Sequence, residues 1–405
     1  MVNTLPTSRR AVQDSLRPAV QALQTELVTW RRQFHQHPEL GFREVNTAAV
    51  VTEQLRAWGY EPQTGIAQTG VVATLSSGRP GPVLALRADM DALPIQELNT
   101  VPYRSRIDGV MHACGHDGHT AILLGVARYL AAHRESFAGT VKLIFQPAEE
   151  GPGGAKPMIE AGVLEHPKVD AILGLHLWND LPLGAVGVKS GPLMAASDFF
   201  DITIQGRGGH GAKPQQTIDA LVIAAQVVTV LQTLVARQMD PLEPVVVTVG
   251  QFQAGTARNV IADNATLGGT IRYFNPALAP QLPERLETLV AGICAAQGAH
   301  YRLDYRHLYP PVINAPELAA LVREVAQVVV ETPSGMVPNC QTMGGEDMAF
   351  FLQEVPGCYF FLGSANPDLA LTYPHHHPCF DFDETALGLG VEMFIRCIEH
   401  YCQPC

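Results

Sequence analysis

The stretch Val83-Leu-Ala-Leu-Arg-Ala-Asp-Met-Asp91 joins a short apolar run to two acidic residues. The apolar part, Val83–Leu86, predicts a buried strand. Similar runs return at Val141–Phe145 and Ala171–Leu175, and Thr120–Ala132 has the composition of a helix. This alternation of strands and helices predicts an α/β fold built on a mainly parallel sheet with flanking helices.

The rhythm changes near residue 198. The sequence then predicts strands at 199–205, 245–252, 265–274 and 301–307, with helices at 217–237 and 283–297. The order β-α-β-β-α-β is that of a ferredoxin-like α+β unit. Pro310-Pro311 marks the return to the α/β pattern. We therefore expect a catalytic domain in two parts, residues 1–192 and 309–405, interrupted by an inserted domain at 193–308.

Composition limits the partners that we expect. The net charge is −12, which argues against nucleic acid or an anionic membrane as the main partner. No apolar run is expected to reach the ~18 residues of a membrane span. The first twenty residues have no apolar core like that of a signal peptide. A cytoplasmic protein that acts on a small molecule is the expectation.

Polar side chains that can bind metals or move protons stand at the expected ends of these elements. They are Asp89 and Asp91, Cys114 and His116, Glu149 and Glu150, His176, and the triplet His375–His377. Each has an ordinary structural explanation: a core histidine, a solvated acidic loop, or a surface histidine cluster. Five such segments at predicted strand or helix ends, where α/β folds collect their functional residues, favour a metal site.

The residue types fit a pair of divalent ions. Thiolate, imidazole and carboxylate together suit a borderline-soft metal. Cys114 can bridge two ions, because a metal deprotonates a thiol and sulfur has several lone pairs. Glu150 can bind metal while Glu149 accepts a proton from the attacking water. We expect Asp117 to orient a ligand imidazole.

The chain resembles the dinuclear-metal amidohydrolase branch of the aminoacylase/carboxypeptidase metallohydrolases. This branch includes hippurate hydrolases, indole-3-acetyl-amino-acid hydrolases and N-acyl-amino-acid amidohydrolases. The resemblance runs from about residue 27 to residue 398. It is carried by RRQFHQHPELGFRE (31–44), HACGHDGHT (112–120), FQPAEEG (145–151), GLHLW (174–178), GRGGHGAKP (206–214), NVIADNATLGGTIRYF (259–274), GGEDMAFF (344–351) and HHHPCFDFDE (375–384).

The resemblance implies a role for each residue of the cluster. Cys114 bridges two metals, His116 and Glu150 bind one of them, His176 and His376 bind the other, and Glu149 is the general base. His376 is selected from the triplet because family members have His-x-Pro there. Asp89 and Asp91 are expected to support the ligands without binding metal. The implied cofactors are two divalent ions per subunit, zinc or manganese first, with cobalt and nickel as alternatives.

The resemblance also assigns residues of the inserted domain, which would serve as a lid and a dimerisation domain. The segment Gly206–Lys213 is no phosphate-binding loop, because Ala212-Lys213-Pro214 stands where Gly-Lys-Ser/Thr is required. Instead, His210 is expected to polarise the scissile carbonyl of a site in the other protomer of a homodimer. Asn259 and Arg272 resemble substrate contacts, and a guanidinium suits a carboxylate. The ordinary alternatives are a glycine-rich turn and an exposed arginine at a strand end.

The expected activity is metal-dependent hydrolysis of N-acyl amino acids, such as hippurate-like, N-acetyl or indoleacetyl conjugates, to a carboxylic acid and an amino acid. Two alternatives stay open. One is a dipeptidase or carboxypeptidase on the same scaffold. The other is a catalytically silent protein that binds acyl amino acids, although such a protein has no chemical need for both Glu149 and the metal ligands.

Overall fold

The structure is a computed structural model that describes residues 9–330 and 335–403. The chain divides into two compact units, each with its own hydrophobic core. Unit 1 contains the chain up to Leu193, Ile313–Gln341, and the chain from Asp347 onwards. Unit 2 contains Met194–Val312 together with the short piece Thr342–Glu346.

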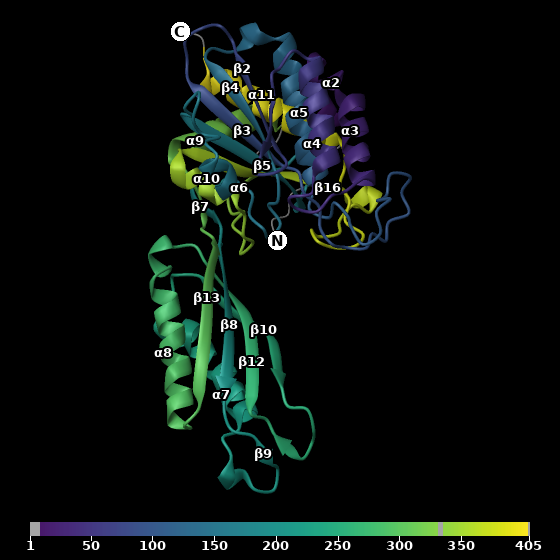
Figure 1. Cartoon of the computed structure of the whole chain (residues 1–405). Helices are drawn as coiled ribbons and strands as arrows, with labels where there is room; N and C mark the ends of the chain where they lie inside the picture. Colours follow the sequence, from purple (N-terminus) through teal and green to yellow (C-terminus); the bar gives the residue numbers. More distant parts are fainter. Residues whose placement is uncertain (1–8, 331–334, 404–405) are drawn as a thin grey trace. The chain divides into compact units, whose positions relative to one another are not determined.

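Unit 1 alternates helices and strands, as Figure 1 shows. Its helices are α1 (Arg9–Asp14), α2 (Pro18–Gln21), α3 (Gln24–Gln36), α4 (Val45–Ala57), α5 (His116–Ala132), α6 (Ala155–Glu160), α9 (Pro316–Val329), α10 (Met348–Glu354) and α11 (Thr385–Tyr401). Its strands are β1 (Gln63–Ile66), β2 (Gly70–Ser76), β3 (Val83–Asp89), β4 (Thr140–Gln146), β5 (Ala171–Pro182), β6 (Val186–Gly187), β15 (Met336–Val337) and β16 (Gly357–Ala365). Strand β7 (Gly191–Met194) pairs with β14 (Val312–Asn314).

The eight strands of unit 1 form one sheet in the order β1-β2-β4-β3-β5-β16-β6-β15. The central strands β4, β3, β5 and β16 are parallel, whereas β1–β2, β2–β4 and β16–β6 are antiparallel. The α/β class is confirmed, and the sheet is mixed rather than mainly parallel, because the hairpin β1–β2 adds antiparallel strands at one edge. The central strands are buried on both faces, which explains their nearly continuous apolar sequences.

The carboxyl ends of the central strands position the acidic residues. Strand β3 ends at Asp89 and β4 ends at Gln146, three residues before Glu149. The prediction that His176 follows the end of its strand is wrong, since β5 continues to Pro182. Pairing of β3 with β5 stops at Gly174, whereas β16 stays paired with β5 beyond it. His176 therefore lies two residues beyond the last β3–β5 pair while its own strand continues.

One helix boundary differs from the expectation. Helix α5 begins at His116 instead of Thr120, because Gly115 takes a left-handed conformation with φ 91° and Asp117 Oδ1 accepts a hydrogen bond from the Gly118 N–H at 2.9 Å. The metal-binding imidazole expected at His116 thus lies in the first turn of a buried helix.

Unit 2 has a second sheet. It contains β8 (Ala196–Gln205), β9 (Gly209–His210), α7 (Ala220–Gln238), β10 (Val245–Ala254), β11 (Val260–Ile261), β12 (Asn264–Tyr273), α8 (Gln281–Ala296) and β13 (His300–Tyr309). The order β10-β12-β8-β13 is antiparallel throughout, and β9 pairs with β11. Alternate side chains of β8, such as Phe200, Ile202 and Ile204, form the core with α7 and α8. This arrangement places residues 206–212 just beyond the end of β8.

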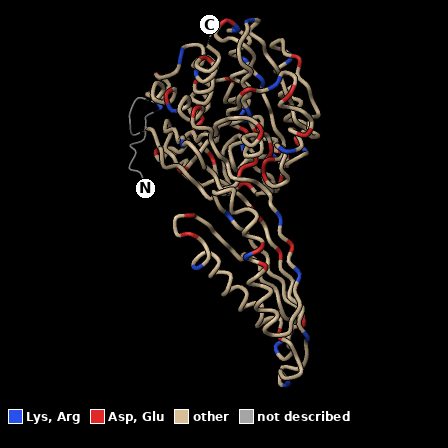
Figure 2. Tube along the Cα trace, turned by 90° about the vertical axis from the view of Figure 1, so that its left-hand side faces the viewer, with Lys and Arg blue, Asp and Glu red and all other residues tan. Residues whose placement is uncertain are grey.

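Helix α7 departs from the expectation that no segment could span a membrane. By length and composition it is apolar enough to do so. Ile223, Val227 and Leu231 of this helix are nevertheless buried in the core of unit 2. Charged residues of both signs are interspersed along the trace of each unit (Figure 2). Because its apolar residues Ile223, Val227 and Leu231 are buried, α7 is a core helix of unit 2 in this structure.

Candidate metal centre

Cys114 lies at the centre of the candidate metal site in unit 1. Its thiol forms one group of donors with His116 and His176 and a second group with Glu150 and His376, each within 4.8 Å. A third group joins His116 with Glu149 and Glu150. Cys114, His116 and His176 are buried. Membership of two groups fits a bridging thiolate, and the third group holds His116 and Glu150 together.

Hydrogen bonds orient the His116 ring. Its Nδ1 lies 3.0 Å from the Asp91 backbone oxygen, an acceptor, so in the neutral ring, the form that binds metal, Nδ1 donates and Nε2 carries the lone pair. That Nε2 atom is buried and has no hydrogen-bond partner among the described residues. A buried, unpartnered acceptor is costly unless something binds it, and a metal ion does so. Asp91 thus holds the His116 imidazole, in line with the supporting role expected of it.

His176 is held in the same way. Its Nδ1 donates to the Leu177 carbonyl at 2.6 Å, which leaves Nε2 facing Cys114 Sγ at 3.4 Å. His119 fixes the neighbouring backbone, because its Nε2 accepts from the Leu177 N–H at 2.9 Å while its Nδ1 donates to Asp89 at 2.6 Å. Both nitrogens of His119 are engaged, so His119 supports His176 and is not itself available as a ligand.

The histidine triplet contributes one candidate ligand. His376 Nε2 lies 3.0 Å from Glu150 Oε1 without forming a hydrogen bond, as two donors aimed at a common ion would. His375 Nε2 instead donates to the Leu177 carbonyl at 2.9 Å, and burial lowers its pKa to about 3. His377 accepts from the Cys379 N–H through Nδ1. The geometry favours His376, whose backbone is strained at φ 64° and held by the Ala113 carbonyl at 2.8 Å.

The electrostatics of the cluster favour a cation. Burial opposes the charging of His116, but the carboxylates of Asp89, Asp91 and Glu150 outweigh it and raise its pKa to about 10. Burial, together with Glu150, Glu149 and Asp89, raises the pKa of the Cys114 thiol well above its usual value. Carboxylates thus outnumber cationic groups in a buried space. The donor set fits divalent ions, which would neutralise the carboxylates and stabilise the thiolate.

A buried ionic network lies behind the cluster. Arg31 Nε donates to Asp117 Oδ2 at 2.8 Å, and His35 Nδ1 lies 2.8 Å from the same oxygen. Arg31 Nη2 also donates to Asp381 Oδ1 at 2.8 Å. Asp117 therefore contacts Arg31 and His35 and no ligand imidazole, which corrects the sequence expectation. The network ties α3 to the start of α5 and to the loop after the histidine triplet.

Arg87 and Asp347 form a second buried link. Arg87 donates to Asp89 at 2.6 Å and to Asp347 at 2.9 Å, and Asp347 also accepts from the Ala155 N–H at 2.9 Å. Burial opposes ionisation of Asp89, but His116, Arg87 and His119 hold its pKa well below the usual range. Asp347 had no expected role. Its only signal was the motif GGEDMAFF, which shows a resemblance but no contact.

The expected substrate residues lie in unit 2. His210 and Asn259 are exposed and close together, because β9 pairs with β11 and the Gly211 N–H donates to the Asn259 carbonyl at 2.8 Å. His210 Nδ1 accepts from the Ala212 N–H at 3.0 Å, so Nε2 carries the proton and can donate outward. Arg272 is half-buried on β12 opposite Ser197, at the other end of β8.

Arg272 has no ion pair among the residues that the structure describes, although Asp198 exerts a favourable charge effect. Burial lowers the pKa of its guanidinium. A Cβ at Gly345 would lie 2.9 Å from Arg272 Nη1, so glycine makes room for the guanidinium there. A partly buried guanidinium without a carboxylate partner suits an anionic ligand.

Comparisons with known proteins identify the family. The model of Peptidase family M20/M25/M40 matches residues 85–400, and the chain belongs to this family. N-acyl-L-amino acid amidohydrolase of Geobacillus stearothermophilus is 48% identical over 305 residues, 75% of this chain and 82% of that protein. Thermostable carboxypeptidase 2 of Saccharolobus solfataricus is 39% identical over 381 residues, 93% of this chain and 95% of that protein.

A solved structure gives the same result. The Bacillus subtilis YXEP protein, described as a dinuclear metal binding peptidase from the M20 family, superposes with a TM-score of 0.82 and 38% identity. The match covers 95% of this chain and 99% of that chain. The family resemblance noted from the motifs is confirmed. The identities and the coverage place the whole chain, and not one domain alone, within the family.

Proposed function

We propose that this protein is a metal-dependent amidohydrolase that cleaves N-acyl amino acids to a carboxylic acid and a free amino acid. The convergence of Cys114, His116, Glu150, His176 and His376, with Glu149 beside Glu150, is the observation that carries the proposal. The similarity to the amidohydrolase of Geobacillus stearothermophilus supports this substrate class. Zinc or manganese suits the mixed donor set best, with cobalt and nickel as alternatives.

Metal ions bound by these five residues would polarise the substrate carbonyl and lower the pKa of water. Glu149 then accepts the proton of the attacking water and delivers it to the leaving nitrogen. The hydrogen bonds that fix Asp91, His116 and His176 keep the donor atoms in place before substrate arrives. Because Glu149 is largely buried, its carboxylate is kept from bulk water.

For unit 2 we propose a ferredoxin-like lid that also forms a homodimer. Strand β8 has ten residues, so its two ends are about 30 Å apart. His210 and Asn259 belong to one end and Arg272 to the other, and one copy of unit 2 cannot bring all three to one substrate. We therefore assign Arg272 to the carboxylate of the substrate in its own chain. His210 of the partner subunit would donate Nε2–H to the scissile carbonyl.

The runner-up is a carboxypeptidase or dipeptidase, which the carboxypeptidase of Saccharolobus solfataricus favours. Both reactions break an amide next to an amino acid and need the same metal centre. They differ in the acyl group, which is a carboxylic acid in one case and an amino acid or peptide in the other. For either activity we propose a cytoplasmic location and a small-molecule substrate, with no nucleic acid or membrane partner.

A release assay separates the two activities. The protein is chelated, reloaded with zinc, manganese, cobalt or nickel, and offered acetyl, benzoyl, indoleacetyl and long-chain acyl amino acids beside matched dipeptides. We expect amino-acid release from one or more acyl amino acids at a kcat/KM at least ~10 times that for dipeptides, about 1.4 kcal/mol of discrimination. Faster release from dipeptides would favour the runner-up. Binding without cleavage under every metal would contradict both.

A further inference from the structure

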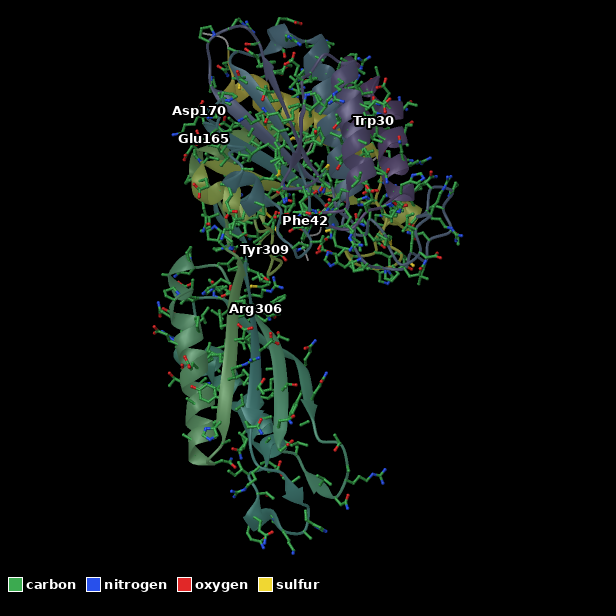
Figure 3. The ribbon with its side chains drawn as sticks, viewed as in Figure 1. Trp30, Phe42, Glu165, Asp170, Arg306 and Tyr309 are labelled. Carbon is green, nitrogen blue, oxygen red and sulfur yellow. The ribbon has the colours of Figure 1, made fainter. Side chains whose placement is uncertain are left out.

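The turn Leu40–Glu44 packs against the loop that carries Glu149. A Cβ on Gly41 would lie 3.0 Å from the Ala148 Cβ and 3.1 Å from its Cα, so only glycine allows this approach. The Ala92 N–H donates to the Glu39 carbonyl at 2.8 Å, which ties the same turn to the residue after Asp91. Figure 3 labels Phe42 of this turn. The motif PELGFRE thus lies beside the candidate metal centre, although its residues have no part in the proposed chemistry.

The Glu44 carboxylate joins the turn to the loop. Its Oε1 accepts hydrogen bonds from the Ala148 N–H at 2.9 Å and from the Phe42 N–H at 3.1 Å. Its Oε2 accepts from the Thr69 hydroxyl at 2.5 Å. Glu44 is fully buried, and burial raises its pKa. A buried carboxyl group is costly, and three donors aimed at it compensate for the loss of water.

Both backbone groups held by Glu44 are strained. Ala148 has φ 55° and Phe42 has φ 60°, the left-handed region that residues with a Cβ avoid. Such conformations are strained in residues with a Cβ and persist only where the surroundings enforce them. Because Ala148 directly precedes Glu149, its φ and ψ set the direction in which the Glu149 side chain leaves the loop.

Asp91 holds the next two residues. Its Oδ1 accepts from the Glu149 N–H at 3.0 Å and its Oδ2 from the Glu150 N–H at 2.9 Å. Three consecutive N–H groups therefore donate to two carboxylates. Asp91 also contacts His116, so its removal would disturb a metal ligand directly. Glu44 belongs to none of the donor groups around Cys114, and it can be altered separately.

We propose that Glu44 is a positioning residue for Glu149: it enforces the left-handed conformation of Ala148 and thereby aims the general base at the substrate. This inference rests on the proposed function for its catalytic consequence, but not for its structural part. Loss of Glu44 frees Ala148 to relax towards φ below zero. Glu149 then turns away, while His116 and His176 keep the backbone hydrogen bonds that orient their rings.

Three variants separate positioning from general loss of stability. Glu44→Ala removes the acceptor. Glu44→Gln keeps Oε1 for both N–H donors, and its amide can donate to Thr69 Oγ1, which accepts as well as donates. Thr69→Val is the matched control: it removes one hydrogen bond of Glu44 but leaves the bond to Ala148. Each variant is loaded with the same metal as the parent protein, and its metal content, kcat, KM and amide hydrogen exchange are measured.

In Glu44→Ala we expect kcat to fall by ~10–100-fold, the effect of misplacing a catalytic group, with KM and metal content near those of the parent. Exchange of peptide 147–152 without substrate should accelerate about fivefold or more, as for one lost hydrogen bond. Glu44→Gln and Thr69→Val should stay close to the parent in kcat and in exchange of this peptide.

Three results would overturn the proposal: unchanged exchange at 147–152 in Glu44→Ala, a kcat no lower than that of Thr69→Val, or metal loss in proportion to activity. If Glu44→Ala does not fold, Glu44→Asp takes its place, because the shorter side chain cannot reach Ala148 from the same backbone. The exchange measurement needs no substrate. A chain that cleaves no acyl amino acid would therefore contradict the proposed function while the exchange still decides whether Glu44 holds the loop.

Discussion

The metal centre of unit 1 and the substrate residues expected in unit 2 differ in how their side chains are held. In unit 1, His116 and His176 are buried, and a backbone carbonyl fixes the ring of each. In unit 2, His210 is exposed and Arg272 lies at the opposite end of the sheet. The described residues of unit 1 bring the candidate metal ligands together, whereas the substrate binding that we propose for His210 and Arg272 would need a second copy of the chain.

The largest expected effect concerns Glu149, which belongs to the buried site of unit 1. Glu149→Gln keeps the shape of the side chain but cannot accept a proton, so kcat should fall by at least ~100-fold with unchanged metal content. Steady-state kinetics and metal analysis of the same sample measure both. Glu160→Gln, an exposed glutamate on α6, is the matched control. Near-normal turnover of metal-loaded Glu149→Gln would show that Glu149 is not the general base.

The second prediction concerns His210, an exposed residue of unit 2. His210→Ala should lower kcat by ~100-fold or more, because one oxyanion donor has a contribution of this size. Exposed His300→Ala is the control. Mixing His210→Ala protomers with Glu149→Gln protomers should restore activity, since a shared site in the mixed dimer would combine an intact Glu149 with an intact His210 of the partner subunit. Verified mixed dimers without activity would contradict the shared site.

Arg272→Lys should change binding more than chemistry. Lysine keeps the charge but loses the planar fork, so we expect KM to rise about tenfold with a smaller change in kcat. Arg302→Lys, on the exposed part of β13, is the control. An equal loss for an amide analogue without the carboxylate would show that Arg272 does not recognise that group.

The smallest effect concerns the stability of unit 2. Burial raises the pKa of Asp198, which accepts from the Tyr305 hydroxyl at 2.7 Å. Its stabilising contribution is therefore complete below its unfolded pKa and is lost as the pH rises through the raised folded pKa. Asp198→Asn stays neutral, so its melting temperature should exceed that of the parent increasingly as the pH rises towards neutrality. Exposed Asp304→Asn should show no such trend in thermal unfolding.

Pattern and composition predicted the α/β class and most element positions, because the central strands are buried on both faces and their sequences are apolar throughout. They failed at His176, where β5 continues after β3 stops pairing. The end of a strand in a sheet depends on its neighbours, which one sequence does not reveal. The early start of α5 depended on a left-handed Gly115, which also has no unique sequence signal.

The candidate metal-binding side chains and a supporting role for Asp91 could be inferred from residue type and motif, but the contacts that hold the loop of Glu149 could not. Asp91 and Glu44 hold Ala148, Glu149 and Glu150 through backbone N–H groups, and such contacts leave no trace in residue spacing. Glu44 is the last residue of the motif RRQFHQHPELGFRE and still had no expected role. The sequence does not predict the left-handed backbone of Ala148 either, because alanine rarely takes this conformation.

The proposed function depends on a two-ion hydrolytic centre around Cys114 in unit 1. The most direct test counts bound ions per chain after chelation and reloading, in the parent and in Cys114→Ala, with amino-acid release measured on the same samples. We predict two ions per parent chain, with activity that follows their restoration, and a reduced count with lost activity in Cys114→Ala. An unchanged count in Cys114→Ala, or full activity of the parent without metal, would contradict the account.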